Sequence, residues 1–348
     1  MKKKILGILL CVVMIAGLTG CGTEYSETEK MISKAEILNW DKILEETNGN
    51  AALAEDYENR LYVFMGYVQE IDVDLCNVSG MIVELEKEEL KKLNKGDTIV
   101  VIGTLKDATT KPKLENAIRL DKKTVEDNYL IALVKKRISG DRMSVIQEYK
   151  YSDYTFDKNT YLVNSYKEID TTYTDREAKT YKLKYDEKGN IIESGNQSEV
   201  HTYLYNEDNT ILKEIYKMGE FTHVYDYTYE KDKNDHIIKK IKKDENNKNT
   251  FYSYEYDDND RAIRETVESS PDKWDYKLEY NNNGQLVKKS WKHNESSLDN
   301  TLEYDYDEFG NITKEVETND RMTNETYGLL IHHDKKTTNY YYGIVDKK

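Results

Sequence analysis

Residues 301–317 read TLEYDYDEFGNITKEVE, and they contain one complete unit of the pattern that fills the C-terminal half of the chain. Strict alternation in TLEYDY places the leucine and both tyrosines on one face of a strand. Asp307–Gly310 predicts a tight turn, because Asp hydrogen-bonds its own backbone and Gly adopts a positive φ without strain. Asn311–Glu317 predicts a second strand that returns antiparallel to the first.

The same unit recurs along the chain, each time with a tyrosine directly before the acidic turn. Successive lead tyrosines are 20, 24, 27, 24 and 26 residues apart. A repeat of this length predicts stacked units that share one sheet. Of the 30 tyrosines, 25 lie at or beyond Tyr149, which predicts a domain boundary within residues 126–148. The lead tyrosines are Tyr185, Tyr205, Tyr229, Tyr256, Tyr280 and Tyr306.

The Tyr-Asp pairs, the Gly-Asn turns at residues 189–190 and 310–311, and the aliphatic returning strands resemble YD repeats, also called RHS repeats. The resemblance covers about residues 147–330 and implies a long antiparallel meander. Large members of the family close their sheet around a toxin, but this chain has too few repeats to enclose a cargo. We therefore expect an open, curved sheet over residues 149–345. The lead tyrosines are predicted to form a binding face on it, and packing of the sheet alone is the alternative.

The first 22 residues, MKKKILGILLCVVMIAGLTGCG, indicate where the protein resides. Three lysines precede an apolar run over residues 5–18, which is shorter than the about 20 residues of a membrane-spanning helix. The end of the run resembles the lipobox of bacterial lipoproteins. This implies a signal peptide over residues 1–20, acyl chains such as palmitate on the cysteine, and anchoring to the extracytoplasmic face of the cell membrane. An ordinary secretory signal or a membrane helix is the alternative. The lipobox comprises Leu18, Thr19, Gly20 and the lipidated Cys21.

Charge and cysteine content narrow the possible partners. The formal charge of −15 becomes −18 once the three lysines of residues 1–20 are removed. Such an acidic body repels nucleic acid, so no nucleic-acid partner is expected. Cys11 leaves with the signal and Cys21 is modified, so Cys76 remains alone and no intramolecular disulfide is expected. The polar residues 21–34 predict a flexible tether.

Residues 35–122 predict a small second domain. The spacing of apolar residues favours a helix over Ala35–Glu58, and period-two patterns predict strands over residues 61–71, 81–85, 98–105 and 113–120. With Gly66-Tyr67-Val68 and Gly96-Asp97-Thr98, this order resembles the OB-fold domains of bacterial lipoproteins, called tRNA-anticodon-like. The resemblance implies a small barrel with a helix. Residues 123–148 are predicted to be a linker.

OB-folds bind oligonucleotides or oligosaccharides through aromatic stacking and a basic groove. This segment has 14 acidic against 9 basic residues between Ala51 and Asp121. Tyr62 and Phe64 share one strand face and form either a stacking platform or part of the barrel core, and the core is the favoured interpretation. Nucleic-acid binding is again not expected.

The sequence has no recognisable catalytic or metal-binding motif, so neither a cofactor nor a metal is predicted. The six histidines match no zincin or triad spacing. The loop that starts at Asp305 resembles an EF-hand, but Phe309 and Val316 occupy ligand positions. A non-enzymatic surface lipoprotein that binds a protein or a glycan is therefore favoured. The alternatives are an envelope assembly or sorting accessory, and an envelope hydrolase that uses carboxylates such as Asp257, Asp258 and Asp260.

Overall fold

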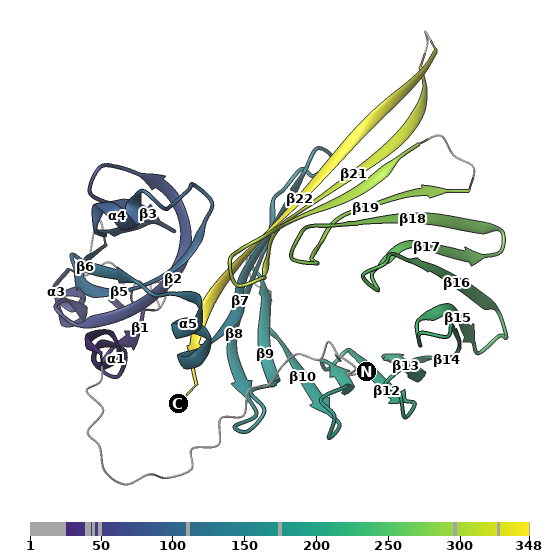
Figure 1. The fold of residues 1–348 in the computed structure, drawn as a ribbon, viewed down its shortest axis with the longest axis horizontal. Coiled ribbons are helices and arrows are strands. Elements are labelled where there is room, and N and C mark those ends of the chain that lie inside the picture. The colour runs from purple at the N-terminus through teal and green to yellow at the C-terminus, as the bar shows by residue number, and fades with distance from the viewer. Residues whose placement is uncertain are drawn as a thin grey trace. The chain divides into compact units, whose positions relative to one another are not determined.

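A computed structural model describes residues 26–38, 43, 46–47, 51–108, 112–172, 176–294, 298–325 and 328–347. The lipobox residues Leu18, Thr19, Gly20 and Cys21 lie outside the described residues. The chain divides into two compact units (Figure 1). The first comprises the described residues up to Leu130, with Phe156–Leu162 and the residues from Ile344 on, and the second comprises Ile131–Thr155 and Val163–Gly343.

The first unit is a small barrel. Strand β2 pairs antiparallel with β3 and also with β5, while β4 and β5 both pair with β6, so five strands close on themselves. Its elements are α1 Glu27–Ile32, β1 Glu36–Ile37, α3 Ala51–Ala54, the 3₁₀ turn η1 Glu55–Tyr57, β2 Leu61–Ile71, β3 Cys76–Val78, β4 Met81–Val83, α4 Lys87–Leu90, β5 Thr98–Lys106, β6 Lys113–Arg119 and α5 Lys122–Asn128.

The strands predicted over residues 61–71, 81–85, 98–105 and 113–120 are confirmed as β2, β4, β5 and β6, and β2 and β5 are buried on both faces over most of their length. Tyr62 and Phe64 are 2% and 9% exposed and belong to the core cluster, which confirms that they pack the barrel and do not form an open platform. Cys76 is a free cysteine in the same core, and burial raises the pKa of its thiol to about 11.

The described part of the N-terminal segment differs locally from two expectations. Residues 21–34 were expected to be a flexible tether, but helix α1 forms there. Its start is fixed by a capping box, in which the Ser26 side chain accepts from the Glu29 N–H and the Glu29 carboxylate accepts from the Ser26 N–H. The helix expected over Ala35–Glu58, with a break near residues 48–50, forms in part, since Ala51–Ala54 is helix α3 and Glu55–Tyr57 is a 3₁₀ turn, but Glu36–Ile37 pairs parallel to β2 as a strand.

The second unit is a closed antiparallel barrel of sixteen strands. The expectation of an open, curved meander over residues 149–345 was therefore wrong. A barrel of sixteen strands is wide enough to leave an open interior. Its strands are β7 Tyr129–Gly140, β8 Gln147–Phe156, β9 Val163–Asp170, β10 Lys179–Tyr185, β11 Ile191–Gly195, β12 Glu199–Tyr205, β13 Ile211–Met218, β14 Phe221–Lys231, β15 Ile237–Asp244, β16 Asn249–Tyr256, β17 Ala262–Ser269, β18 Asp272–Tyr280, β19 Leu286–His293, β20 Asn300–Tyr306, β21 Ile312–Glu325 and β22 Gly328–Asp346.

The barrel closes where its first strand, β7, meets its last, β22. The Asp141 N–H donates to the Lys335 carbonyl, and the Lys335 N–H donates back to the Asp141 carboxylate. Arg142 adds an ion pair with Asp334. The backbones approach closely here, since a Cβ on Gly140 would lie 2.9 Å from the Lys335 carbonyl oxygen.

The residues predicted to be a linker, 123–148, instead include most of helix α5 and the whole of β7. Helix α5 starts at an Asp121 cap, whose carboxylate accepts from the Thr124 N–H. The sequence of β7 has a single tyrosine, at its first residue, and no Tyr-Asp turn, so its pattern does not mark it as part of the repetitive sheet. Its partner β22 lies at the far end of the chain, which is why the closure was missed.

We expect Gly140→Val to weaken the closure by about 1–3 kcal/mol, because the new side chain overlaps the Lys335 carbonyl. Hydrogen exchange should show lost protection of β7 and β22, and thermal unfolding should begin at a lower temperature. Ser253→Val, at an exposed position of β16, is the matched control. Equal unfolding temperatures for the two variants would contradict the closed seam.

Candidate binding wall of the large barrel

Each repeat of the barrel turns through the same hydrogen-bonded loop. In the β16–β17 turn the Asp257 N–H donates to the Arg261 carbonyl, and the Asp257 carboxylate accepts the N–H groups of Asn259 and Arg261. Asp260 adopts a φ of 62°, the left-handed conformation that Asn, Asp and Gly tolerate. A bulge precedes Tyr256 and shifts the register by one residue. The geometry of this loop explains why the turns of the repeat contain Asp, Asn and Gly residues.

The six lead tyrosines predicted as a binding face all fasten neighbouring repeats together. Each hydroxyl donates to the carbonyl of the first residue of the preceding returning strand, at 2.7–2.9 Å. The pairs are Tyr185 to Val163, Tyr205 to Ile191, Tyr229 to Ile211, Tyr256 to Ile237, Tyr280 to Ala262 and Tyr306 to Leu286, and Tyr342 repeats the bond to Ile312. Their rings are half-buried at one end of the barrel, so the structure gives them a packing role.

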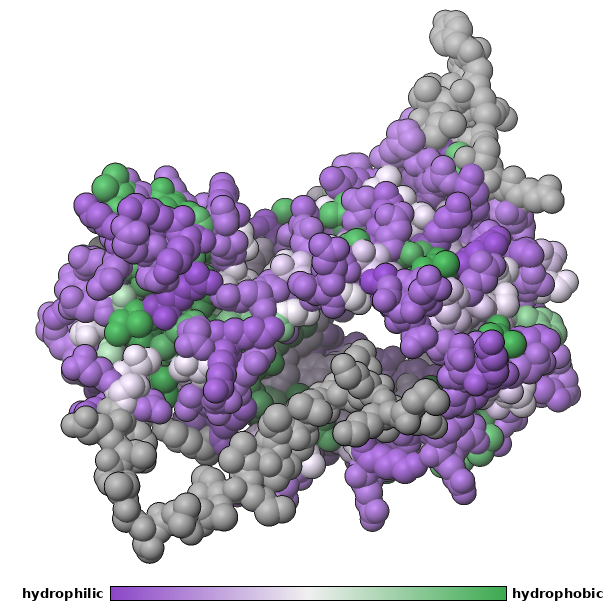
Figure 2. All heavy atoms as spheres, in the orientation of Figure 1, coloured by the Kyte–Doolittle hydropathy of each residue, from purple (hydrophilic) through white to green (hydrophobic). Residues whose placement is uncertain are grey.

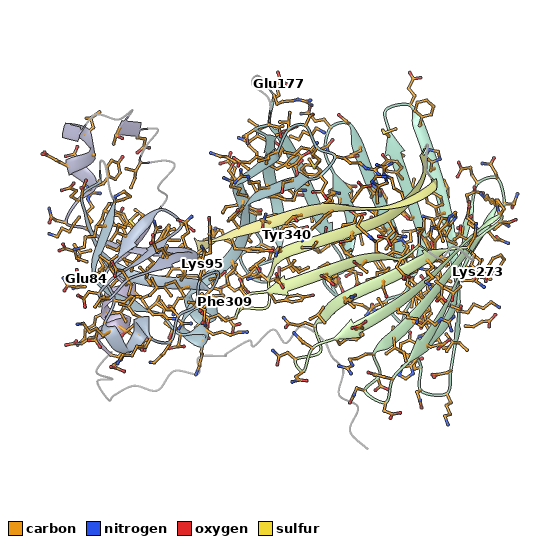
Figure 3. The ribbon with its side chains drawn as sticks, turned by 90° about the horizontal axis from the view of Figure 1, so that it is seen from above. Glu84, Lys95, Glu177, Lys273, Phe309 and Tyr340 are labelled. Atoms are coloured by element: carbon orange, nitrogen blue, oxygen red, sulfur yellow. The ribbon has the colours of Figure 1, made fainter. Side chains whose placement is uncertain are left out.

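The two ends of the barrel differ in their turns. Phe309, in the turn between β20 and β21, and Lys273, beside the turn between β17 and β18, lie at opposite ends (Figure 3). The bulged acidic turns occupy the Phe309 end, and the lead tyrosines lie next to them. Tyr340 lies between the ends, on β22.

Long-range ion pairs identify the face of the sheet that lines the barrel. Lys242 on β15 reaches Glu214 on β13, with Nζ 3.5 Å from Oε2, across the intervening β14. Lys289 on β19 reaches Glu265 on β17 at 3.2 Å, across β18. Strands two apart are separated by roughly 10 Å, so such pairs form most easily on a concave face, where side chains converge. We call this face the inner wall.

The opposite face, the outer wall, carries short ion pairs between adjacent strands. The pairs join register partners such as Lys213 with Asp226 and Lys239 with Glu230, both at 3.1 Å. Arg264 contacts both neighbouring strands, through Glu255 and Asp275. Hydrophilic side chains accordingly cover most of the visible surface (Figure 2).

Five aromatic side chains form a continuous row on the inner wall of β12–β14. Successive ring centroids are 6.1, 4.4, 6.2 and 6.4 Å apart, and the ring planes are 11–27° from parallel. Rings stacked along a wall present their edges to the interior, so the row brings hydroxyl and imidazole groups to this wall. Within the protein, Nδ1 of His201 and of His223 bonds Glu214 and Glu245, and the Tyr216 hydroxyl donates to Met218 Sδ. The row runs Tyr203, His201, Tyr216, His223 and Tyr225.

Glu214 lies at the centre of this wall and binds three neighbours. The Tyr227 hydroxyl donates to Oε2 at 2.7 Å, His201 Nδ1 lies 3.1 Å from Oε1, and Lys242 approaches from β15. Burial raises the pKa of Glu214, but the two hydrogen bonds and the lysine charge outweigh it and hold the pKa below its ordinary value. Burial and the bond to Glu214 in turn raise the pKa of the Tyr227 hydroxyl.

The same arrangement occurs one double repeat later. Lys242 Nζ lies 3.6 Å from the Tyr225 ring centroid, and Tyr225 is the register partner of Glu214. Lys289 Nζ lies 3.9 Å from the Tyr276 ring, and Tyr276 is the register partner of Glu265. Each is a Glu–Tyr–Lys unit, in which the lysine crosses a tyrosine face and ends on a carboxylate.

Three of the carboxylates considered for catalysis or metal binding have partners within or beside their own turns. Asp257 is held by the Arg261 guanidinium and by its own turn, while Asp260 contacts His236. Asp307, in the turn that resembles an EF-hand, accepts the N–H groups of Phe309 and Asn311. Across the part of the chain that the structure describes, no group of three or more His, Cys, Asp or Glu side chains could hold a metal ion.

Sequence reasoning missed the Glu–Tyr–Lys units. Glu214 and Glu265 occupy equivalent places in the returning strands β13 and β17, and Lys242 and Lys289 lie in the returning strand that follows each of them, β15 and β19. This alternation of sign from one returning strand to the next is visible in the sequence. The ion pairs that this alternation produces can be recognised only once the strands are known to share a concave face.

The comparisons with known proteins do not assign this chain to a family. No family model and no curated protein matches the sequence. Among solved structures, a porin-like protein from Bacteroides uniformis is 11% identical with a TM-score of 0.41, over 60% of this chain and 96% of that one. A TcdB2–TccC3–Cdc42 complex is 11% identical with a TM-score of 0.23, over 68% of this chain and 15% of that one.

The Glu214 network predicts a pH-dependent stability. The folded-state pKa of Glu214 lies below its value in the unfolded chain, so ionised Glu214 stabilises the fold above the ordinary carboxyl pKa. This contribution is lost as the pH falls through the folded-state pKa. Glu214→Gln should therefore lower the unfolding free energy by about 1–3 kcal/mol at neutral pH, and the difference should shrink below about pH 4.

Urea unfolding at a series of pH values measures this difference. Glu230→Gln is the control, because the Glu230 side chain is 60% exposed and its pair with Lys239 lies on the outer wall. A pH-independent cost for Glu214→Gln would contradict the assigned role of its charge.

Proposed function

We propose that this protein is a non-enzymatic, lipid-anchored binding protein on the extracytoplasmic face of a bacterial cell membrane, and that the inner wall of its large barrel binds a glycan chain. The observation that carries the glycan assignment is the row of edge-on aromatic rings beside Glu214. The resemblance of residues 18–21 to a lipobox supports the proposed location at the cell membrane.

Membrane attachment in this proposal depends on Cys21. Two or three acyl chains anchor a protein stably, because each buried methylene contributes about 0.8 kcal/mol. Among the described residues, no helix has the length and apolar character to cross a bilayer. The charged register pairs of the outer wall, such as Lys213 with Asp226, favour a barrel surrounded by water, because a wall facing lipid carries an apolar band.

The chemistry of the inner wall favours a glycan over a protein partner. Protein interfaces have an apolar core, whereas the row from Tyr203 to Tyr225 is surrounded by hydroxyl, imidazole, carboxylate and ammonium groups. Fixed groups of this kind match the hydroxyls of a sugar, and the charged ones form the stronger hydrogen bonds. The Glu214 network holds several of them in place, which lowers the entropic cost of binding.

The lipid anchor is tested by substituting Cys21. In a bacterial host fed an alkyne-labelled fatty acid, the wild type should be labelled and should fractionate with membranes, and Cys21→Ser should lose the label. Cys11→Ser is the control, because Cys11 lies in the segment that is removed. Retained labelling of Cys21→Ser would refute the anchor.

Glycan binding is tested with an immobilised panel of peptidoglycan and envelope polysaccharides, followed by calorimetry on the lipidated protein in detergent. Tyr216→Ala should weaken binding at least about tenfold, equivalent to about 1.4 kcal/mol, because Tyr216 lies at the middle of the aromatic row. Phe251→Ala, which removes a 40%-exposed ring from the outer wall, is the control. The proposal fails when no glycan binds, or when both variants are equally impaired.

A further inference from the structure

A third lysine of the inner wall, Lys240, rests on a tyrosine ring as the lysines of the two Glu–Tyr–Lys units do. Among the described residues, no carboxylate pairs with it. Lys240 Nζ lies 3.7 Å from the Tyr252 ring centroid, as close as the lysines of the two complete units lie to their tyrosines. Lys240 shares the face of Lys242, two residues along β15, and pairs in register with Tyr252 of β16. Within the described part of the chain, its ammonium group has no hydrogen bond or ion pair.

The register shows what is missing. In both complete units, the residue paired with the tyrosine on the far side from the lysine is a glutamate, namely Glu214 beside Tyr225 and Glu265 beside Tyr276. Around Lys240 the order along the chain is reversed, because Tyr252 lies on the strand that follows the lysine, and the residue paired with Tyr252 on its far side is Val267. Valine therefore occupies the place where the other two units have a carboxylate.

The environment of Lys240 makes its missing partner costly. The side chain is half-buried, and burial lowers the pKa of its ammonium group; the charge of Glu265 opposes this and that of Lys242 adds to it. The Glu265 carboxylate is bound by Lys289, and the Lys242 ammonium is bound by Glu214. A desolvated charge without a counterion is unfavourable, so this position would gain from an anion that enters the barrel.

We propose that Lys240, with the Tyr252 ring beside it, binds the carboxylate of an acidic sugar, and that this carboxylate occupies the place of the missing glutamate. The inference rests on the proposed glycan-binding function and adds the substrate class, a glycan that contains uronic acid. Lys242, two residues along the strand, is paired with Glu214, so Lys240 supplies the positive charge for the ligand.

A carboxylate fits this position better than a phosphate does. In the complete units a lysine on a tyrosine ring is satisfied by a single carboxylate. A phosphate carries nearly two charges, and the Glu265 carboxylate next to Lys240 on the same wall would repel it more strongly. The Tyr252 ring also offers an apolar surface to the sugar that carries the carboxylate.

The test is calorimetric titration of the lipidated full-length protein with an oligogalacturonate and with a neutral galactooligosaccharide of the same length. The acidic glycan should bind at least about tenfold more tightly. Lys240→Met should abolish this preference and Lys240→Arg should retain most of it. Lys239→Met is the matched control, because Lys239 faces the outer wall and pairs with Glu230. Lys240→Met should also unfold at the same temperature as the wild type or higher, since it removes an unpaired charge.

A second variant separates charge from packing. Val267→Glu supplies the missing carboxylate from the protein, so it should displace the acidic glycan without touching Lys240. Val267→Gln should retain binding.

Equal affinity for acidic and neutral glycans, or no effect of Lys240→Met and Val267→Glu, would overturn the inference while leaving glycan binding intact. Inorganic phosphate that competes at equal concentration would assign the site to a small anion instead. Failure of every glycan to bind would refute the proposed function itself.

Discussion

The hydrogen bond from each lead tyrosine to the preceding repeat is the interaction on which the large barrel depends. A hairpin end is normally the weakest part of an antiparallel pair, because its loop contributes few contacts. Here the bulge before Tyr256 sets the ring so that its hydroxyl reaches the Ile237 carbonyl, and the same bond recurs around the barrel. Each turn is thereby fastened to its neighbour, so the acidic loops form one continuous rim.

The sequence predicted what is local and missed what is distant. Alternation and turn residues located the repeated strands and the acidic turns, because Asp307 and Gly310 determine their own backbone geometry. The closed barrel could not be derived in this way. Closure depends on Gly140 and Lys335, which lie far apart in the chain and carry no repeat signature. The hydrogen bonds of the lead tyrosines were out of reach for a similar reason, since the tyrosines could be recognised in the sequence but the distant carbonyls that accept from them could not.

Charge is arranged differently on the two walls, and curvature accounts for the difference. On the convex outer wall the side chains diverge, so Lys213 reaches only the adjacent strand, where Asp226 lies. On the concave inner wall they converge, so Lys242 spans two strands to Glu214. The inner pairs therefore connect alternate hairpins and support the curvature that lets sixteen strands close. A chain with a net negative charge can in this way still hold a local positive charge, the Lys240 ammonium group, on its inner wall.

An incomplete unit is tolerable in such a barrel because stability is distributed. In a repetitive sheet, stability is approximately the sum of the repeats and their nearest-neighbour contacts, so one missing ion pair costs little of the total. The sheet at Lys240 is already held by the Tyr256 bond to Ile237 and by the outer pair of Lys239 with Glu230. Val267 therefore leaves the fold intact and leaves one ammonium group facing the interior without a partner. Among Lys240, Lys242 and Lys289, which rest on inner-wall tyrosine rings, Lys240 is the one without a carboxylate partner in the part of the chain that the structure describes.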